Sequence, residues 1–141
     1  MSNTGTDSHG VIRSDFPGGW AGDSVSIKEG KNIGEMQQKA LNFNKKLLTW
    51  RKDAKVVHKG KLMHFEPKDG VYTYFKYDND QTVMVILNKN KEQYDLNLDR
   101  FEERLQGYQS GRDIFSGMDY SLDQFIPLEP MKPYILELSK I

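Results

Sequence analysis

The stretch HGVIRSDFPGGW, residues 9 to 20, holds the first side chains that could do chemistry. Arg13 and Asp15 stand two positions apart, so a guanidinium can lie beside a carboxylate. A proline and two glycines then lead to Trp20, and such a string is typical of a shaped loop. Because a turn follows Asp15 and not the continuation of a strand, we predict that Arg13 and Asp15 pair locally or hold the loop in place.

The histidines and clustered acidic residues do not predict a metal site. His9, His58 and His64 are dispersed, and none has a histidine or carboxylate partner of the HExxH type. Residues 78–80, Asp-Asn-Asp, resemble the start of a calcium loop but lack its glycine at position six and its glutamate at position twelve. We predict a hairpin turn there, and no metal or cofactor site. The absence of cysteine also excludes disulfides, thiolate nucleophiles and cysteine zinc ligands.

Aromatic side chains concentrate in VYTYFKYD, residues 71–78. Tyr72 and Tyr74 alternate within it, so they share one face of a strand. Exposed rings on one face could form a flat platform for a ligand. The opposing interpretation, which the sequence favours, is that the rings pack across strands or against a helix.

The elements that must position these side chains fall into three regions. Residues 1–33 show no sustained hydrophobic period and are rich in Gly, Asp, Ser and Asn, so they predict a long loop that we expect to be mobile. Residues 34–55 contain an amphipathic helix over 34–52, whose wide apolar face needs a partner. The apolar positions recur at steps of three and four: Met36, Ala40, Phe43, Leu47 and Trp50.

Residues 56–141 predict a mainly β, antiparallel domain. The runs 71–78 and 82–88 flank turn residues and predict a β-hairpin. A short helix at 99–107, capped by Asp99, is also expected. The other expected strands lie at 61–66, 93–98, 112–116 and 133–139. Short strands at this spacing indicate an antiparallel sandwich or barrel.

Composition excludes two classes of partner. The 141 residues fit one compact domain or a small domain with an appendage. The 20 basic and 20 acidic side chains balance, so nothing predicts nucleic-acid binding. No apolar run approaches about 18 residues, so no membrane span is predicted.

Three segments in order carry a resemblance to a known family: IRSDFPGGW, the helix ending LLTWRK, and VVHKGKLMHFEPKDGVYTYFKY with TVMVILNKN. They resemble the C-terminal end of glycoside hydrolase family 13, and most of all the neopullulanase, cyclomaltodextrinase and α-amylase enzymes of Bacteroidetes type. The resemblance implies a (β/α)8 barrel followed by an antiparallel β-sandwich, domain C. It makes residues 1–33 the loop after the last barrel strand, 34–55 the last barrel helix and 56–141 domain C.

The resemblance also implies where catalysis lies. Retaining α-glycosidases use two carboxylates roughly 5–5.5 Å apart, and the family supplies them from barrel strands upstream of this chain, so we expect no catalytic residue here. The family's nucleophile sits in an Arg-x-Asp motif, yet the turn after Asp15 does not fit it. Phe16 and Trp20 could edge a sugar-binding groove, because flat rings stack on pyranose faces. Tyr72 and Tyr74 are the other substrate-binding candidates.

Two functions follow from this resemblance. The first is a C-terminal fragment of a starch, maltodextrin or cyclodextrin hydrolase, inactive alone, with a structural role covering the catalytic barrel. The alternative is a carbohydrate-binding module that holds α-glucan through exposed aromatics. The expected partners are the missing barrel, α-glucan, or a second copy paired through the helix face. Many relatives are exported, which associates the parent enzyme with the periplasm or cell envelope.

Overall fold

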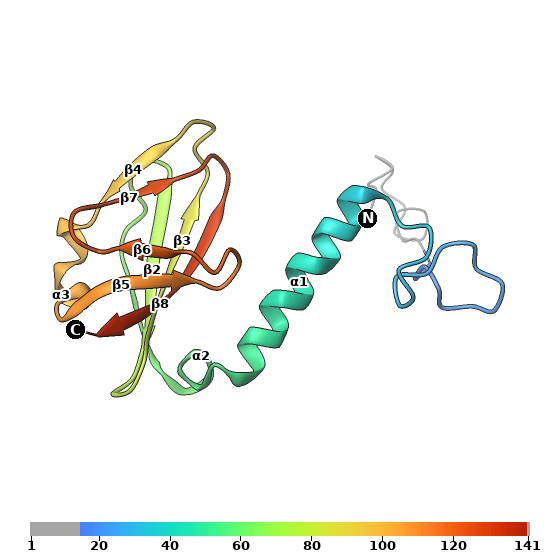
Figure 1. The fold of residues 1–141 in the computed structure, drawn as a ribbon, viewed down its shortest axis with the longest axis horizontal. Coiled ribbons are helices and arrows are strands. Elements are labelled where there is room, and N and C mark those ends of the chain that lie inside the picture. Colours follow the sequence, from blue (N-terminus) through green and yellow to red (C-terminus); the bar gives the residue numbers. More distant parts are fainter. Residues whose placement is uncertain (1–14, 141) are drawn as a thin grey trace. The chain divides into compact units, whose positions relative to one another are not determined.

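A computed structural model describes residues 15–140. The chain divides into two compact units, residues 1–44 and residues 45–141, and each is described by itself. The first unit contains the loop and the start of helix α1 (Glu35–Asp53), and the second contains the end of α1 and a β-domain (Figure 1). Residues 1–14 of the loop that we expected to be mobile lie outside the described residues.

Helix α1 confirms the amphipathic helix predicted over 34–52. Glu35 in its first turn and Lys52 in its last turn place favourable charges at the two ends of the helix dipole. The ammonium of Lys39 lies 2.7 Å from the Glu35 carboxylate, one turn away. None of the residues of α1 is buried. Its exposed large apolar side chains are Met36, Phe43 and Leu48.

The described part of the N-terminal loop is held by local hydrogen bonds. The Asp23 carboxylate accepts the backbone N–H groups of Gly18 at 2.9 Å and Trp20 at 3.1 Å. Gly18 has a φ of 88°, and a Cβ there would lie 2.5 Å from the Ser26 hydroxyl, so only glycine fits this turn. Residues 15–33 form no helix or strand, and the mobility of this region stays a prediction. The expected pairing of Asp15 involves a residue outside the described range.

The β-domain contains two antiparallel sheets (Figure 1). A six-stranded sheet has the order β1-β2-β3-β8-β5-β6, and a two-stranded sheet pairs β4 with β7. The elements are α2 (Lys55–Lys59), β1 (Lys61–His64), β2 (Val71–Tyr77), β3 (Thr82–Asn88), β4 (Tyr94–Asn97), a short 3₁₀ turn η1 (Asp99–Phe101), α3 (Glu102–Leu105), β5 (Tyr108–Asp113), β6 (Asp119–Ser121), β7 (Phe125–Leu128) and β8 (Pro133–Lys140).

The main core lies between the two sheets. Along β2 the side chains of Val71, Thr73 and Phe75 are buried, while the intervening tyrosines lie on the outer face. Buried residues from both sheets and from the helical segment between β4 and β5 form one cluster: Val71, Phe75, Met84, Ile86, Leu96, Leu98, Phe101, Leu105, Leu122, Ile126, Leu128, Tyr134, Leu136 and Leu138. Each large apolar side chain buried in this way stabilises the fold by about 1.5–3 kcal/mol.

The structure confirms the predicted sandwich but corrects several of its details. The hairpin of β2 and β3 is confirmed. The strand expected at 112–116 instead ends at Asp113, because the Asp113 carboxylate accepts the N–H and the hydroxyl of Ser116 and so turns the chain. Asp99 does not cap a helix: the N-cap of η1 is Leu98, which makes no side-chain cap. Strands β6 and β7 and helix α2 were not predicted, since each has five residues or fewer and no clear period.

Candidate functional site

The aromatic residues predicted to bind substrate fall in different units. Phe16 and Trp20 belong to the unit of residues 1–44 and are 62% and 73% exposed. Tyr72 and Tyr74 belong to β2 in the other unit. The structure therefore brings Tyr72 and Tyr74 together, and sugar binding by any of these four residues stays a prediction.

The two tyrosines lie side by side on the outer face of the six-stranded sheet. Their ring centroids are 5.7 Å apart with a tilt of 37°, and the His64 ring stands edge-on to Tyr72 at 6.4 Å. Tyr74 packs against the apolar cluster of Val56, Val83 and Val85. Burial, followed by the nearby Tyr72, raises the pKa of Tyr74 above its ordinary value. Tyr74 thus serves in packing, whereas Tyr72 borders a shallow groove that Leu87, Met131 and Pro133 also line.

The last turn of α1 is attached to the same outer face. The indole N–H of Trp50 donates to the Glu137 carboxylate of β8 at 2.8 Å, and the Gln81 amide donates to the same oxygen at 3.1 Å. Trp50 also packs against the cluster formed by Val56, Val83 and Val85. The helix end is therefore fixed to the sheet by both a hydrogen bond and apolar contact.

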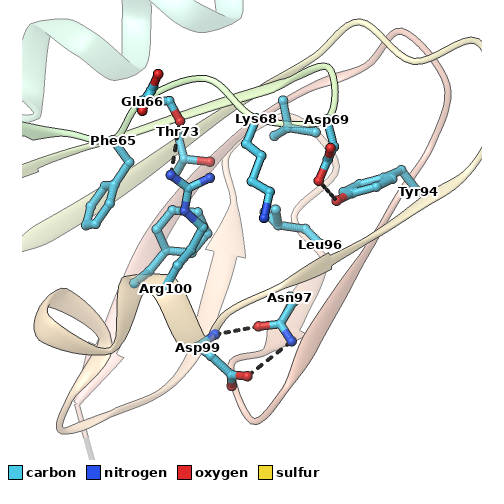
Figure 2. Close-up of a pocket in the computed structure, with 12 residues that line it drawn as sticks. Phe65, Glu66, Lys68, Asp69, Thr73, Tyr94, Leu96, Asn97, Asp99 and Arg100 are labelled. Carbon is cyan, nitrogen blue, oxygen red and sulfur yellow. Dashed lines mark hydrogen bonds between the residues drawn. The ribbon is translucent and has the colours of Figure 1, made fainter.

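A second groove, of about 320 Å³, lies on the opposite side of β2, where that strand faces β4 (Figure 2). Its buried floor consists of Val71, Thr73, Leu96 and Phe101. The half-buried rings of Phe65 and Tyr94 stand at its edges. Its exposed rim is entirely polar: Glu66, Lys68, Asp69, Asn97, Asp99 and Arg100. We call this feature the rim groove.

Hydrogen bonds hold the wall of the rim groove that contains Tyr94. The Tyr94 hydroxyl donates to the Asp69 carboxylate at 3.3 Å. Burial, followed by the charge of Asp69, raises the pKa of Tyr94, so its phenol stays protonated at neutral pH. The Asn97 amide donates to the Asp99 carboxylate at 3.1 Å, and its oxygen accepts the Asp99 backbone N–H at 2.7 Å (Figure 2).

The floor and the opposite wall of the rim groove hold two further polar groups. Arg100 donates to the backbone carbonyl of Glu66 at 3.1 Å, and its guanidinium lies 5.4 Å from the centre of the Phe101 ring. Thr73 is 2% exposed, and its hydroxyl is the one buried side-chain oxygen or nitrogen among residues 15–140 that has no hydrogen-bond partner. An unpaired buried hydroxyl costs about 1–3 kcal/mol.

Comparison with known proteins decides the family. A profile described as the cyclo-malto-dextrinase C-terminal domain matches residues 62–137, which is more than half of the chain. The chain belongs to this family. The matched segment starts in β1 and ends in β8, so the cyclo-malto-dextrinase C-terminal domain corresponds to the β-sandwich.

Solved structures share the fold at low sequence identity. A variant of AmyP in complex with maltotriose is 18% identical, with a TM-score of 0.70 over 83% of this chain and 24% of that one. An Anoxybacillus α-amylase is 15% identical, with a TM-score of 0.65 over 84% and 27%. The α-amylase of Geobacillus thermoleovorans complexed with acarbose is 14% identical, with a TM-score of 0.63 over 84% and 27%. The chain spans about a quarter of the length of these proteins. The resemblance to the C-terminal part of a glycoside hydrolase family 13 enzyme is confirmed.

The buried carboxylate of this C-terminal domain has a structural role. Asp113 is 0% exposed, and one of its oxygens accepts the Ser116 N–H at 2.9 Å and the Ser116 hydroxyl at 2.8 Å. Its other oxygen accepts the N–H of Ile135 at 3.3 Å. Through these bonds the Asp113 carboxylate fixes the turn after β5 against β8. The absence of catalytic residues stays a prediction.

The acidic stretch 78–80 forms the hairpin turn that we predicted. The Asp78 carboxylate accepts the N–H groups of Asp80 at 2.9 Å and Gln81 at 2.8 Å. Within residues 15–140 no three His, Asp or Glu side chains are grouped as metal ligands would be. None of the helices in the described part of the chain is long and apolar enough to cross a bilayer.

Sequence reasoning missed the rim groove. Its lining comes from the loop between β1 and β2 and from the β4–η1 segment, which are about 30 residues apart in the chain and meet only when the two sheets pack. The one local signal was the run Asn97-Leu98-Asp99-Arg100, in which polar side chains interrupt an otherwise alternating strand. Such a run indicates a strand end but not what lies opposite it.

Proposed function

We propose that this chain is the C-terminal part of an α-glucan hydrolase, acting on starch, maltodextrin or cyclodextrin, and that its β-sandwich covers and stabilises the end of a catalytic (β/α)8 barrel. Within this proposal α1 is the last helix of that barrel. The chain alone hydrolyses nothing, because both catalytic carboxylates of a retaining glycosidase lie in the barrel.

The observation that carries the proposal is the extent of the similarity to α-amylases. The unit containing the β-sandwich comprises residues 45–141, or 97 of 141 residues, which is about 69% of the chain. The AmyP variant matches 83% of the chain, and the two α-amylases each match 84%. The similarity therefore extends into residues 1–44, where α1 begins, and is not limited to the sandwich. A match that reaches beyond the sandwich into the unit where α1 begins supports the proposal that α1 belongs to the barrel.

The exposure of α1 supports the same conclusion. A helix of 19 residues with a mixed apolar and polar pattern owes most of its stability to burial of its apolar face. Yet none of its residues is buried, and Met36 and Leu48 are 81% and 60% exposed. Covering each such side chain would add about 1.5–3 kcal/mol. A barrel that lacks its last helix offers the complementary apolar surface.

Fragment complementation tests the proposal. A cyclomaltodextrinase truncated before its last barrel helix is mixed with this chain, and the release of reducing sugar from cyclodextrin is measured. We expect no activity from either part alone and measurable activity from the mixture. Met36→Asp should abolish the gain, because it places a charge where the barrel would cover the helix, whereas the matched control Lys45→Asp, on the opposite polar side of the helix, should keep it.

Physical association between this chain and the truncated enzyme is measured alongside activity. Association without activity, seen as co-elution, would still support docking. Failure of the mixture to associate, or hydrolysis by this chain alone, would contradict the proposal.

The alternative, a carbohydrate-binding module acting through Tyr72 and Tyr74, is supported by the close spacing of the two rings. Titration with maltoheptaose tests it by calorimetry. Heat that disappears in Tyr72→Ala would support this alternative. A flat titration would leave the structural role.

A further inference from the structure

We propose that the rim groove binds one ring of a neutral oligosaccharide, at a site separate from the outer-face tyrosines and from α1. This activity goes beyond the structural role, and it does not depend on that role, because the chemistry of the ligand follows from the walls of the groove itself.

The distribution of apolar and polar groups in the rim groove matches a sugar ring. The floor presents the buried side chains of Val71, Leu96 and Phe101, with the rings of Phe65 and Tyr94 at the edges. The polar groups stand around the rim (Figure 2). A pyranose has the same division, since its faces are C–H groups and its periphery carries hydroxyls. The volume of about 320 Å³ is at the lower end of the range for ligand pockets, roughly 300–1,000 Å³, which suits one ring.

The charges on the rim favour a neutral ligand. Glu66, Asp69 and Asp99 supply acceptors, and Lys68 and Arg100 supply donors, so the net formal charge is close to zero. Sugar hydroxyls both donate and accept, and they can use both kinds of group. A phosphate would meet three carboxylates, and a metal ion would meet two cations. No cluster of metal-ligand type exists among residues 15–140.

The donors and acceptors are already oriented before any ligand enters. Asp69 is held by Tyr94, and the amide of Asn97 is fixed on both sides by Asp99. Arg100 is held by the carbonyl of Glu66. Preorganised side chains lose little conformational entropy on binding. The Lys68 side chain extends toward Leu96 on the other side of the groove (Figure 2).

The test is an NMR titration of the full chain, ¹⁵N-labelled, with maltotriose as a neutral probe. We expect saturable shifts of amides in 65–73 and 94–101, with a Kd on the order of 1 mM. Lys68→Ala and Arg100→Gln should each raise that Kd about tenfold, which is what one charge-assisted hydrogen bond contributes. The matched controls Lys91→Ala and Arg104→Gln, which lie outside the groove, should leave it unchanged. Thermal melting of each variant confirms that it is folded.

Each other outcome overturns the proposal. Absence of saturable shifts means that the groove binds no neutral sugar. Shifts at Tyr72, Tyr74 and their neighbours with none in 94–101 assign the sugar to the outer face. Inorganic phosphate that shifts the groove amides at lower concentration than maltotriose makes the groove an anion site. Failure of the barrel complementation, by contrast, bears only on the structural role, because the groove titration uses this chain alone.

Discussion

The attachment of α1 to the sheet makes a quantitative prediction. Trp50→Phe keeps an aromatic ring against the apolar cluster but removes the indole N–H that donates to Glu137 at 2.8 Å. A hydrogen bond to a charged group contributes about 1.5–3 kcal/mol. Here Glu137 is only half-buried and keeps the bond from Gln81, so the lower end applies. We expect Trp50→Phe to lower the free energy of unfolding by about 1–2 kcal/mol.

A double-mutant cycle separates the bond from the packing. Trp50→Phe, Glu137→Ala and the double variant are unfolded in urea and followed by circular dichroism, because replacing Trp50 leaves only Trp20, in the unit of residues 1–44, as a tryptophan fluorophore. The two changes should be coupled by about 1 kcal/mol, since each removes the same interaction. Trp20→Phe is the matched control: Trp20 is 73% exposed, and its replacement should change stability by less than about 0.5 kcal/mol. A coupling within about 0.3 kcal/mol of zero would show that the bond does not hold the helix end.

Three further changes test the β-domain. Thr73→Val removes an unpaired buried hydroxyl at nearly constant shape and should raise the free energy of unfolding by about 1 kcal/mol in a urea titration; a loss of stability would mean that the hydroxyl is paired. Gly111→Ala places a Cβ 2.9 Å from the Cβ of Leu136 and 3.0 Å from the side chain of Leu138, so it should lower the free energy of unfolding by about 1–3 kcal/mol. An unchanged midpoint of urea unfolding would refute this close contact. Hydrogen bonds from the N–H groups of Gln81 and then Asp80 lower the pKa of Asp78. The ionised carboxylate therefore stabilises the fold above its unfolded pKa of about 3.9, and this stabilisation is lost as the pH falls through the lower pKa of the folded state. Asp78→Asn should therefore be less stable than the natural protein at neutral pH, and the two should become equally stable once the pH is below the lowered folded pKa of Asp78; a difference that persists in acid would assign the effect to shape instead of charge.

The local part of the fold could be predicted from the sequence because its signals are local. The hairpin of β2 and β3 follows from two β-rich runs around residues 78–81, and the structure pairs Tyr77 with Thr82 at that turn. Helix α1 follows from its apolar period. The strand end at Asp113 could not be predicted, because it depends on a carboxylate that bonds both to the following turn and to Ile135 of a distant strand.

Contacts between distant segments explain why the candidate sites were harder to predict. From the sequence, Tyr72 and Tyr74 are equivalent rings on one strand face, yet the apolar cluster beside the end of α1 packs on Tyr74, while Tyr72 stays at a groove edge. The rim groove requires the two sheets to bring residues 65–73 and 94–101 together. A strand pattern specifies which face a side chain occupies, but it does not specify what covers that face.

The two faces of β2 therefore separate the two proposed roles physically. The outer face of the six-stranded sheet holds the end of α1, because Trp50 bonds to Glu137 and packs on the same apolar cluster as Tyr74, so a barrel attached to that helix would contact the sandwich through this face. The inner face opens into the rim groove, where Thr73 and Tyr94 lie. A substitution on one face should leave the other function intact, because side chains on opposite faces of a strand share only the backbone. If changes at Lys68 altered barrel complementation, or changes at Trp50 altered sugar affinity, this separation would be wrong and the sandwich would couple the two sites.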